Sequence, residues 1–151
     1  MIVSRRATIR NSIGLAISGV LGARLSPLGA APQDAAKLLA EFTADVTPVA
    51  GSITFTAPEL AENGNIVPVA VSVDSPMTDD DYVEAVMIVA EENPNPEVIT
   101  FHFTPQSGVA YASTRMRLAK TQKVIAVAKT SNGSVFIDTH HIEVVIGGCG
   151  A

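Results

Sequence analysis

The residue best suited to chemistry in this sequence is Cys149, which lies between Gly148 and Gly150 near the C-terminus. It is the single cysteine among 151 residues, so it cannot form a disulfide within the chain. A thiolate acts as both nucleophile and leaving group in sulfur exchange. The sequence therefore indicates covalent sulfur chemistry at residue 149.

Glycines surround this thiol. Gly147, Gly148 and Gly150 have no side chain and admit backbone angles closed to other residues, and Ala151 adds one methyl group. We expect residues 147–151 to form a flexible arm of up to about 17 Å, at about 3.3–3.6 Å per residue. Such an arm would carry the thiol into a pocket of another protein while the folded body stays outside.

Other reactive side chains do not combine into a recognisable site. His140 and His141 are adjacent, so in a strand they point to opposite faces and cannot easily bind one metal ion together. The carboxylates of residues 79–81 lack the spacing of a calcium loop, and the sequence has no nucleophile elbow or phosphate-binding glycine loop. We expect no catalytic residue, bound metal or cofactor in the body. Two alternatives stay open: a metal site that joins Cys149 to a late histidine, and a disulfide-linked homodimer.

The first 31 residues have the features of an export signal. Arg5 and Arg6 precede a modestly apolar stretch over residues 13–21, and small residues follow. Paired arginines before such a stretch indicate the twin-arginine pathway, which delivers proteins to the bacterial periplasm. We expect cleavage near Ala30 or Ala31, and no membrane anchor because the apolar stretch is too short to span a bilayer.

The charge of the chain limits its partners. The formal net charge is −5, and removal of the leader leaves six basic residues against 15 acidic ones, a net charge of −9. Nucleic acids and anionic membrane surfaces would repel such a body. The same charge disfavours a thiolate at Cys149, so we expect partner proteins to supply electrostatic activation.

Hydrophobic periodicity predicts one helix followed by strands. Apolar residues recur at helical spacing within residues 33–45, and from Gly51 the period changes to two. About seven strands separated by turns are typical of an immunoglobulin-like antiparallel β-sandwich over residues 32–146. Asn63-Gly64 suits a tight hairpin turn, and Pro68 predicts that the strand over residues 67–73 is an edge strand or contains a bulge.

Several stretches resemble the SoxY family of sulfur-oxidation carrier subunits. They are Ala61-Glu62-Asn63-Gly64-Asn65-Ile66-Val67-Pro68-Val69, Asn93-Pro94-Asn95-Pro96-Glu97-Val98, Phe101-His102-Phe103-Thr104-Pro105, the segment from Ser113 to Gln122, and the Gly-Gly-Cys-Gly end. The resemblance implies a periplasmic protein with an immunoglobulin-like fold that pairs with a SoxZ-like subunit. It also implies that Cys149 carries thiosulfate-derived groups between a haem enzyme, a sulfate-releasing hydrolase and, in some systems, a sulfane dehydrogenase.

The sequence departs from the family at its last residue. The family usually ends in Gly-Gly-Cys-Gly-Gly, whereas this chain has Ala151. The additional methyl group restricts the backbone slightly and adds bulk at the tip of the arm. We expect loading of Cys149 to survive this change, although the methyl group could narrow the set of enzyme channels that accept the arm.

Overall fold

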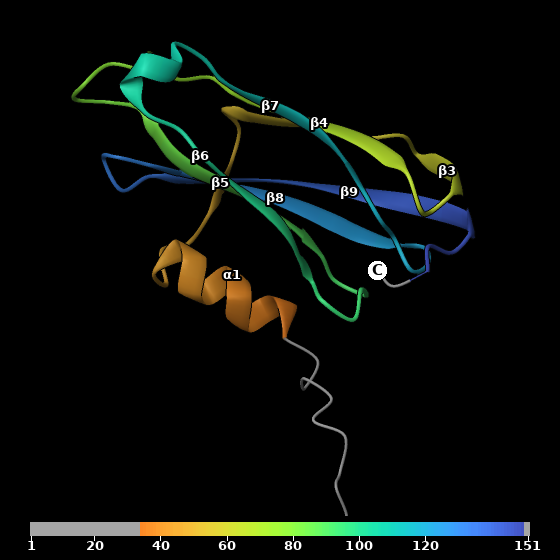
Figure 1. Ribbon diagram of the computed structural model, residues 1–151. Coiled ribbons are helices and arrows are strands. Elements are labelled where there is room, and N and C mark those ends of the chain that lie inside the picture. Colours follow the sequence, from red (N-terminus) through yellow and green to blue (C-terminus); the bar gives the residue numbers. More distant parts are fainter. Residues whose placement is uncertain (1–33, 150–151) are drawn as a thin grey trace, which may run out of the picture.

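The structure, a computed structural model, describes residues 34–149 (Figure 1). The predicted twin-arginine leader with Arg5 and Arg6, its cleavage site, and the residues Gly150 and Ala151 lie outside the described residues. The described part folds as two β-sheets that pack face to face, with one short helix before the strands. The expected β-sandwich is therefore confirmed.

The helix α1 (Ala35–Thr43) begins at Asp34, whose side chain accepts a hydrogen bond from the backbone N–H of Ala36 at 2.9 Å. This contact satisfies one of the free N–H groups of the first turn. Leu39 and Phe42 pack against the buried cluster of Ile125, Val127 and Val135. The helix thus covers the face of the larger sheet that points away from the smaller one (Figure 1). The predicted helix is confirmed, with shorter bounds.

The larger sheet contains six strands in the order β1-β9-β8-β5-β6, and β3 also pairs with β9. Their bounds are β1 Val49–Ala50, β3 Leu60–Asn63, β5 Val83–Ala90, β6 Glu97–His102, β8 Gln122–Thr130 and β9 Val135–Ile146. Strands β5 and β8 are buried along almost their whole length. Both of their faces are covered, by the smaller sheet and by α1, which explains their nearly continuous apolar sequences.

The smaller sheet contains three antiparallel strands in the order β2-β4-β7, with bounds β2 Ile53–Thr56, β4 Val67–Val73 and β7 Ala110–Met116. Along β4 the valines are buried and the intervening residues are more exposed. The buried valines face the larger sheet and form the core with Phe55, Ile88, Leu118 and Ile142, which are at most 1% exposed. The alternation read from the sequence therefore assigns the core face of this strand correctly.

Within residues 34–149 nine strands form instead of about seven, and the larger sheet is not purely antiparallel. The additional short strands β1 and β3 both run parallel to β9. They pair with opposite ends of β9, next to Phe136 and next to Val144, so that the middle of this edge has no partner strand. Strands of two and four residues carry too little periodic signal for detection from one sequence.

Two local predictions were wrong. Asn63-Gly64 does not form a hairpin, because β3 belongs to the larger sheet and β4 to the smaller one, so this turn connects the two sheets. Strand β4 is the central strand of its sheet and not an edge. Pro68 is accommodated there because β2 ends at Thr56, opposite Ala70, and leaves β4 without a neighbour on that side at Pro68.

Within residues 34–149, no helix is long and apolar enough to cross a membrane.

Candidate functional site

The segment that leads to Cys149 is joined to two loops of the body by backbone hydrogen bonds. The N–H of Gly64 donates to the carbonyl of Ile146 at 2.7 Å, and the N–H of Leu118 donates to the carbonyl of Gly64 at 2.8 Å. The N–H of Gly148 then donates to the carbonyl of Leu118 at 2.8 Å. We call residues 63–65 and 117–119 the arm seat, because together they hold the chain that follows β9.

Glycines allow these backbones to approach closely. A Cβ atom on Gly148 would lie 2.7 Å from the carbonyl oxygen of Gly64, which real Cβ atoms do not approach. A Cβ on Gly64 would collide with the carbonyl of Leu118, and one on Gly147 with the carbonyl of Ala119. These three glycines are therefore required by close contact between backbones. None of them has a positive φ.

This packing changes the picture of residues 147–151 as a flexible arm. Gly147 and Gly148 lie against the body and do not extend freely from the end of β9. Because these two glycines have no side chains, their backbones can contact the arm seat, and this contact explains the glycines at least as well as a need for motion. Flexibility from Cys149 onward stays a prediction.

The backbone of Cys149 has a specific partner. Its N–H donates to Oδ1 of Asn65 at 3.0 Å. The side-chain amide of Asn65 is itself oriented by Asn63. Oδ1 of Asn63 accepts two hydrogen bonds from Asn65, one from its side-chain Nδ2–H at 3.0 Å and one from its backbone N–H at 2.9 Å. Because Nδ2 of Asn65 is engaged by Asn63, its oxygen is the atom that faces Cys149.

Two buried amides support the second loop of the seat. Asn93 donates through Nδ2 to the carbonyl of Arg117 at 2.9 Å and accepts the N–H of Ala119 at 3.0 Å. Gln122 donates to Oδ1 of Asn93 at 2.8 Å and to the carbonyl of Lys120 at 3.1 Å. Asn93 is 8% exposed and Gln122 is 2% exposed, so loss of either side-chain amide would leave buried polar groups without partners. This network fixes the loop that presents the carbonyls of Leu118 and Ala119 to the arm.

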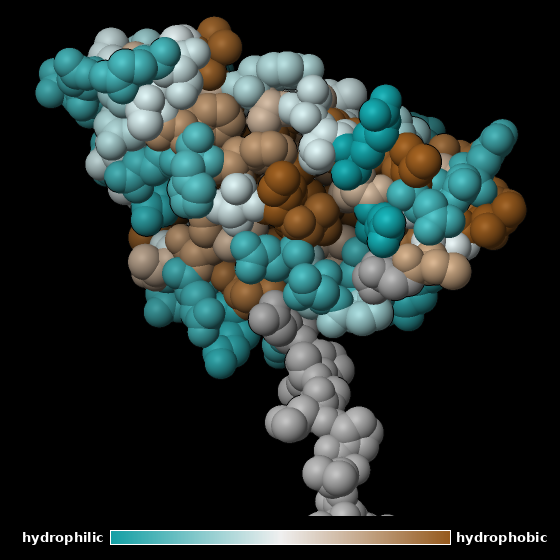
Figure 2. Space-filling view, viewed as in Figure 1, coloured by the Kyte–Doolittle hydropathy of each residue, from teal (hydrophilic) through white to brown (hydrophobic). Residues whose placement is uncertain are grey.

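The thiol of Cys149 is free and exposed. The chain that holds its segment is locally basic: Arg115, Arg117, Lys120 and Lys123 are four of the six basic residues that follow the expected leader. In Figure 2 hydrophilic side chains lie over the end of β7 at the right of the view, and also at its left and lower edges. The segment from the end of β7 to the start of β8 thus carries most of the basic residues of the described chain, while Glu62 and Glu92 lie beside the same loops.

One of these cations is paired with a carboxylate. Nζ of Lys120 lies 2.7 Å from Oε2 of Glu92. The hydrogen bond and the positive charge of Lys120 lower the pKa of Glu92 from its ordinary value. Both side chains are more than half exposed, so the pair contributes little to stability.

The histidines lie far from the thiol. The ring of His140 packs edge-on against Phe55 with the ring centroids 5.4 Å apart, and its Nε2 lies 3.7 Å from Oδ2 of Asp138. Along β9, His140 lies six positions before Ile146, a distance of about 20 Å at about 3.2–3.4 Å per residue. In residues 34–149, no group of three or more His, Cys, Asp or Glu side chains is arranged to hold a metal ion. The alternative of a metal bound by Cys149 and a late histidine is therefore not favoured.

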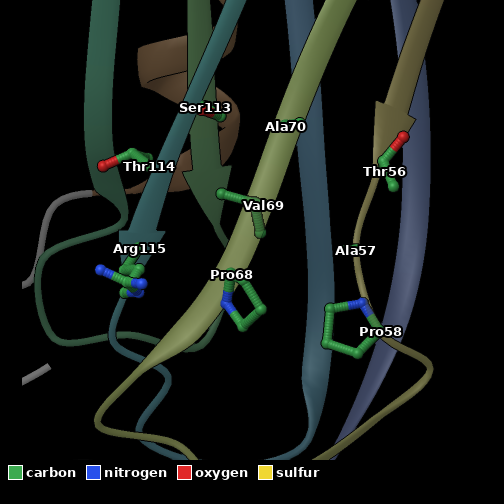
Figure 3. A pocket seen from close by; sticks show the side chains of 9 residues that line it. All are labelled: Thr56, Ala57, Pro58, Pro68, Val69, Ala70, Ser113, Thr114 and Arg115. Atoms are coloured by element: carbon green, nitrogen blue, oxygen red, sulfur yellow. The ribbon is translucent and has the colours of Figure 1, made fainter.

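The smaller sheet carries an open groove of about 820 Å³ (Figure 3). It forms where β2 ends and its continuation through Ala57 and Pro58 diverges from β4. Figure 3 shows Pro58 and Pro68 on its two sides, with Arg115 on the adjacent strand β7. Its lining contains no acid, histidine or cysteine, so its serine and threonine hydroxyls have no base beside them in the lining.

A family model described as "Sulfur oxidation protein SoxY" matches residues 39–149, so the match extends through the body to the cysteine. The chain belongs to the SoxY family. The resemblance seen in the sequence is thus confirmed. Family membership associates this chain with sulfur oxidation and with the other proteins of that system.

Solved structures agree with membership of the SoxY family. The sulfur carrier protein SoxY from Chlorobium limicola f. thiosulfatophilum matches with a TM-score of 0.60 and 28% identity, over 72% of this chain and 89% of that chain. A superoxide reductase (neelaredoxin) from Ignicoccus hospitalis matches with a TM-score of 0.56 and 17% identity, over 62% of this chain and 79% of that one. A superoxide reductase from Nanoarchaeum equitans has a TM-score of 0.51 and 11% identity, over 64% and 99%. At these identities the two reductases show a shared fold alone.

No curated protein sequence matches this chain.

The fold brings most of the SoxY-like stretches together around the arm. Asn63-Gly64-Asn65, Asn93 and the loop of residues 117–122 contact one another or the segment that leads to Cys149. The stretch Phe101–Pro105 does not take part in these contacts. Reading the sequence alone treated Asn63-Gly64 as a hairpin turn and missed the role of these residues and of Asn93 in holding the arm. Their shared presence in family-like stretches was the one signal that pointed to them.

Proposed function

We propose that this chain is a sulfur carrier that holds thiosulfate-derived groups covalently on Cys149 during periplasmic thiosulfate oxidation. The observation that carries the proposal is an exposed, free thiol at the edge of a folded body, within a SoxY family match that reaches residue 149. The carrier provides a covalent attachment point and leaves catalysis to its partners.

The chemistry expected at the thiol has two steps. In the first, Cys–SH and thiosulfate join through a new S–S bond to give Cys–S–S–SO₃⁻, with release of one proton and two electrons to a haem enzyme. In the second, water attacks the sulfur of the SO₃⁻ group and the S–SO₃⁻ bond breaks. The products are sulfate, two protons and a persulfide, Cys–S–S⁻. A thiol is suited to both steps because sulfur is a good nucleophile and a good leaving group.

The basic segment beside the arm suits an anionic cargo. Thiosulfate and the loaded adduct are anions, and a body with a net charge of −9 after leader removal would repel them. Arg117 and its basic neighbours offset this repulsion where the arm is held. From the sequence, only partner proteins are expected to supply the electrostatic activation of Cys149. These basic residues add a contribution from the chain itself.

The open side of this chain's sandwich offers a surface to which a partner subunit could bind. The free edges of β6 and β7 border this side, and Phe101 and Phe103 are only partly buried there. Figure 2 shows hydrophobic atoms exposed between β7 and the larger sheet. We assign this surface to a SoxZ-like subunit, since aromatic side chains and unpaired strand edges favour association. The haem enzyme, the hydrolase and a sulfane dehydrogenase would then act on the arm in turn.

The proposal is tested by Cys149→Ser in a strain that oxidises thiosulfate. We expect complete loss of thiosulfate-dependent sulfate formation, because a hydroxyl cannot form the S–S bond. Mass spectrometry of the wild-type protein, purified without reductant, should find a sulfur adduct on the peptide that contains residue 149. Ser113→Ala, an exposed change in the groove, is the matched control and should leave sulfate formation unchanged.

Sulfate formation that persists in Cys149→Ser, with the variant present at the wild-type level, would refute the carrier role. Non-reducing electrophoresis separates the carrier from a disulfide-linked homodimer. Full activity in a sample that contains no disulfide-linked form of this chain throughout the assay excludes the disulfide-linked homodimer.

A further inference from the structure

The contacts around Asn65 differ from those of an ordinary turn. An asparagine in a turn usually hydrogen-bonds to backbone groups close to it in the sequence. Asn65 instead accepts from the N–H of Cys149, 84 positions away, while Asn63 orients its amide. The result is a hydrogen bond between the body and the backbone of the very residue that carries the thiol.

The glycines make this contact possible. Gly64 and Gly148 bring their backbones so close that side chains are excluded, and the hydrogen bond from Gly148 to Leu118 fixes the residue before the cysteine. Cys149 is thus held at its own backbone and at the preceding residue, while its side chain stays exposed. The body fixes the position of the residue without covering its sulfur.

We propose that Asn65 is a positioning residue that docks Cys149 on the surface of its own subunit, so that the thiol is presented from a defined place between visits to partner enzymes. This inference rests on the proposed carrier function and adds a docked state to it. The docked segment then includes Gly147, Gly148 and the backbone N–H of Cys149. A partner with a deep pocket must break the hydrogen bonds of Asn65 and Leu118 to draw the arm in.

Docking by one exposed hydrogen bond has a limited effect on the equilibrium. Such a bond typically changes an equilibrium constant by about 2- to 12-fold. The docked state is therefore favoured and still easily left, which suits a carrier that must release its arm. Asn63 contributes indirectly because it selects the orientation of the Asn65 amide.

Amide hydrogen exchange at Cys149 tests the docked state. It is measured by NMR on the reduced full chain, with the peptide Gly-Gly-Cys-Gly-Ala as the undocked reference. We expect the Cys149 amide of the wild-type protein to exchange more slowly than that of the peptide. Asn65→Ala should raise its exchange rate by about 2- to 12-fold. Asn65→Asp retains an acceptor oxygen and should stay within about two-fold of the wild type.

Asn132→Ala is the matched control, because Asn132 also accepts local hydrogen bonds in an exposed turn but makes none to the arm. This change should leave exchange at Cys149 unaffected. Exchange of core amides such as that of Val127 shows whether each variant is folded. If Asn65→Ala does not fold, the comparison of the wild type with the peptide still decides whether Cys149 is docked.

A wild-type Cys149 amide that exchanges at the peptide rate would overturn the docked state. An equal acceleration in Asn65→Ala and Asn132→Ala would overturn the role of Asn65. None of these measurements requires sulfur cargo. Loss of the carrier function and loss of the docked state are therefore distinguishable: sulfate formation by Cys149→Ser addresses the first, and exchange at Cys149 addresses the second.

Discussion

The two ends of the sandwich use the same residue types for different purposes. At the end away from the arm, Gly51, Gly108 and Gly133 have φ values of 111°, 72° and 84°, and a Cβ on any of them would meet no atom within 4 Å. At the arm end, Gly64 and Gly148 have no positive φ, and a Cβ on either would meet backbone atoms. Glycine supplies backbone conformation at one end and close approach at the other.

Asparagine follows the same division. Asn132, at the far end, is exposed and makes contacts to a neighbouring turn, including Oδ1 of Asp81 at 3.2 Å. Asn93, at the arm end, is buried and bonds to backbone groups of residues 117 and 119. The arm end is therefore a built structure, where small residues and amides fix several segments together. The far end is an ordinary set of turns.

The largest expected effect comes from Gly64→Ala. The new Cβ collides with the carbonyl of Leu118, so we expect a loss of about 3 kcal/mol in the free energy of unfolding, the upper end of the range for forced overpacking. Asn at this position should be worse than Ala because it is larger. Urea unfolding of both variants measures the loss.

The matched pair at the far end is Gly133→Ala and Gly133→Asn. Here the order should reverse, because Asn tolerates the left-handed region better than Ala and open space surrounds the residue. The same order of Ala and Asn at both positions would remove the distinction between the two kinds of glycine.

A smaller effect is expected from Asn93→Ala. The change leaves the carbonyl of Arg117 and the N–H of Ala119 without their partner, at a cost of about 2 kcal/mol in the free energy of unfolding. Asn132→Ala, on the exposed turn, should cost about 1 kcal/mol or less. Thermal or urea unfolding compares the two, and equal losses would contradict the view that the arm end is specially supported.

The smallest effect concerns charge. Arg117→Gln should slow the reaction of Cys149 with a dianionic disulfide reagent such as dithionitrobenzoate by about two- to four-fold relative to neutral dithiodipyridine, from Coulomb energies at about 10 Å in water. The ratio of the two rates isolates the charge of the reagent from changes in the thiol. Stopped-flow absorbance at low salt measures both rates.

Lys129→Gln, at the far end of β8, is the control for this charge effect. It also removes one positive charge, but seven positions of β8 separate it from Gln122 at the arm end, about 23 Å at about 3.3 Å per residue, so the ratio should stay unchanged. Added salt should abolish the effect of Arg117→Gln through screening. A ratio that responds equally to both changes would mean that net charge alone matters, and not the basic segment.

Most of the fold could be predicted from the sequence because its signals are local. Alternating valines in residues 67–73 and the dense apolar run of residues 83–90 identify strands by side-chain period and by burial on one or both faces. Partners of a strand leave no such local signal. Pro68 indicated an edge, whereas the early end of β2 at Thr56 allows a proline in a central strand.

The sequence by itself determined the chemistry of this protein: one thiol among glycines, an acidic body and family-like stretches that lead to a sulfur carrier. Only the tertiary structure decided how the thiol is presented. The contact between Asn65 and Cys149 joins residues 84 positions apart, and the clash that demands glycine at residue 64 comes from the carbonyl of Leu118. Residue type fixes what a side chain can react with, whereas close approach of distant backbones exists only once the two sheets have packed.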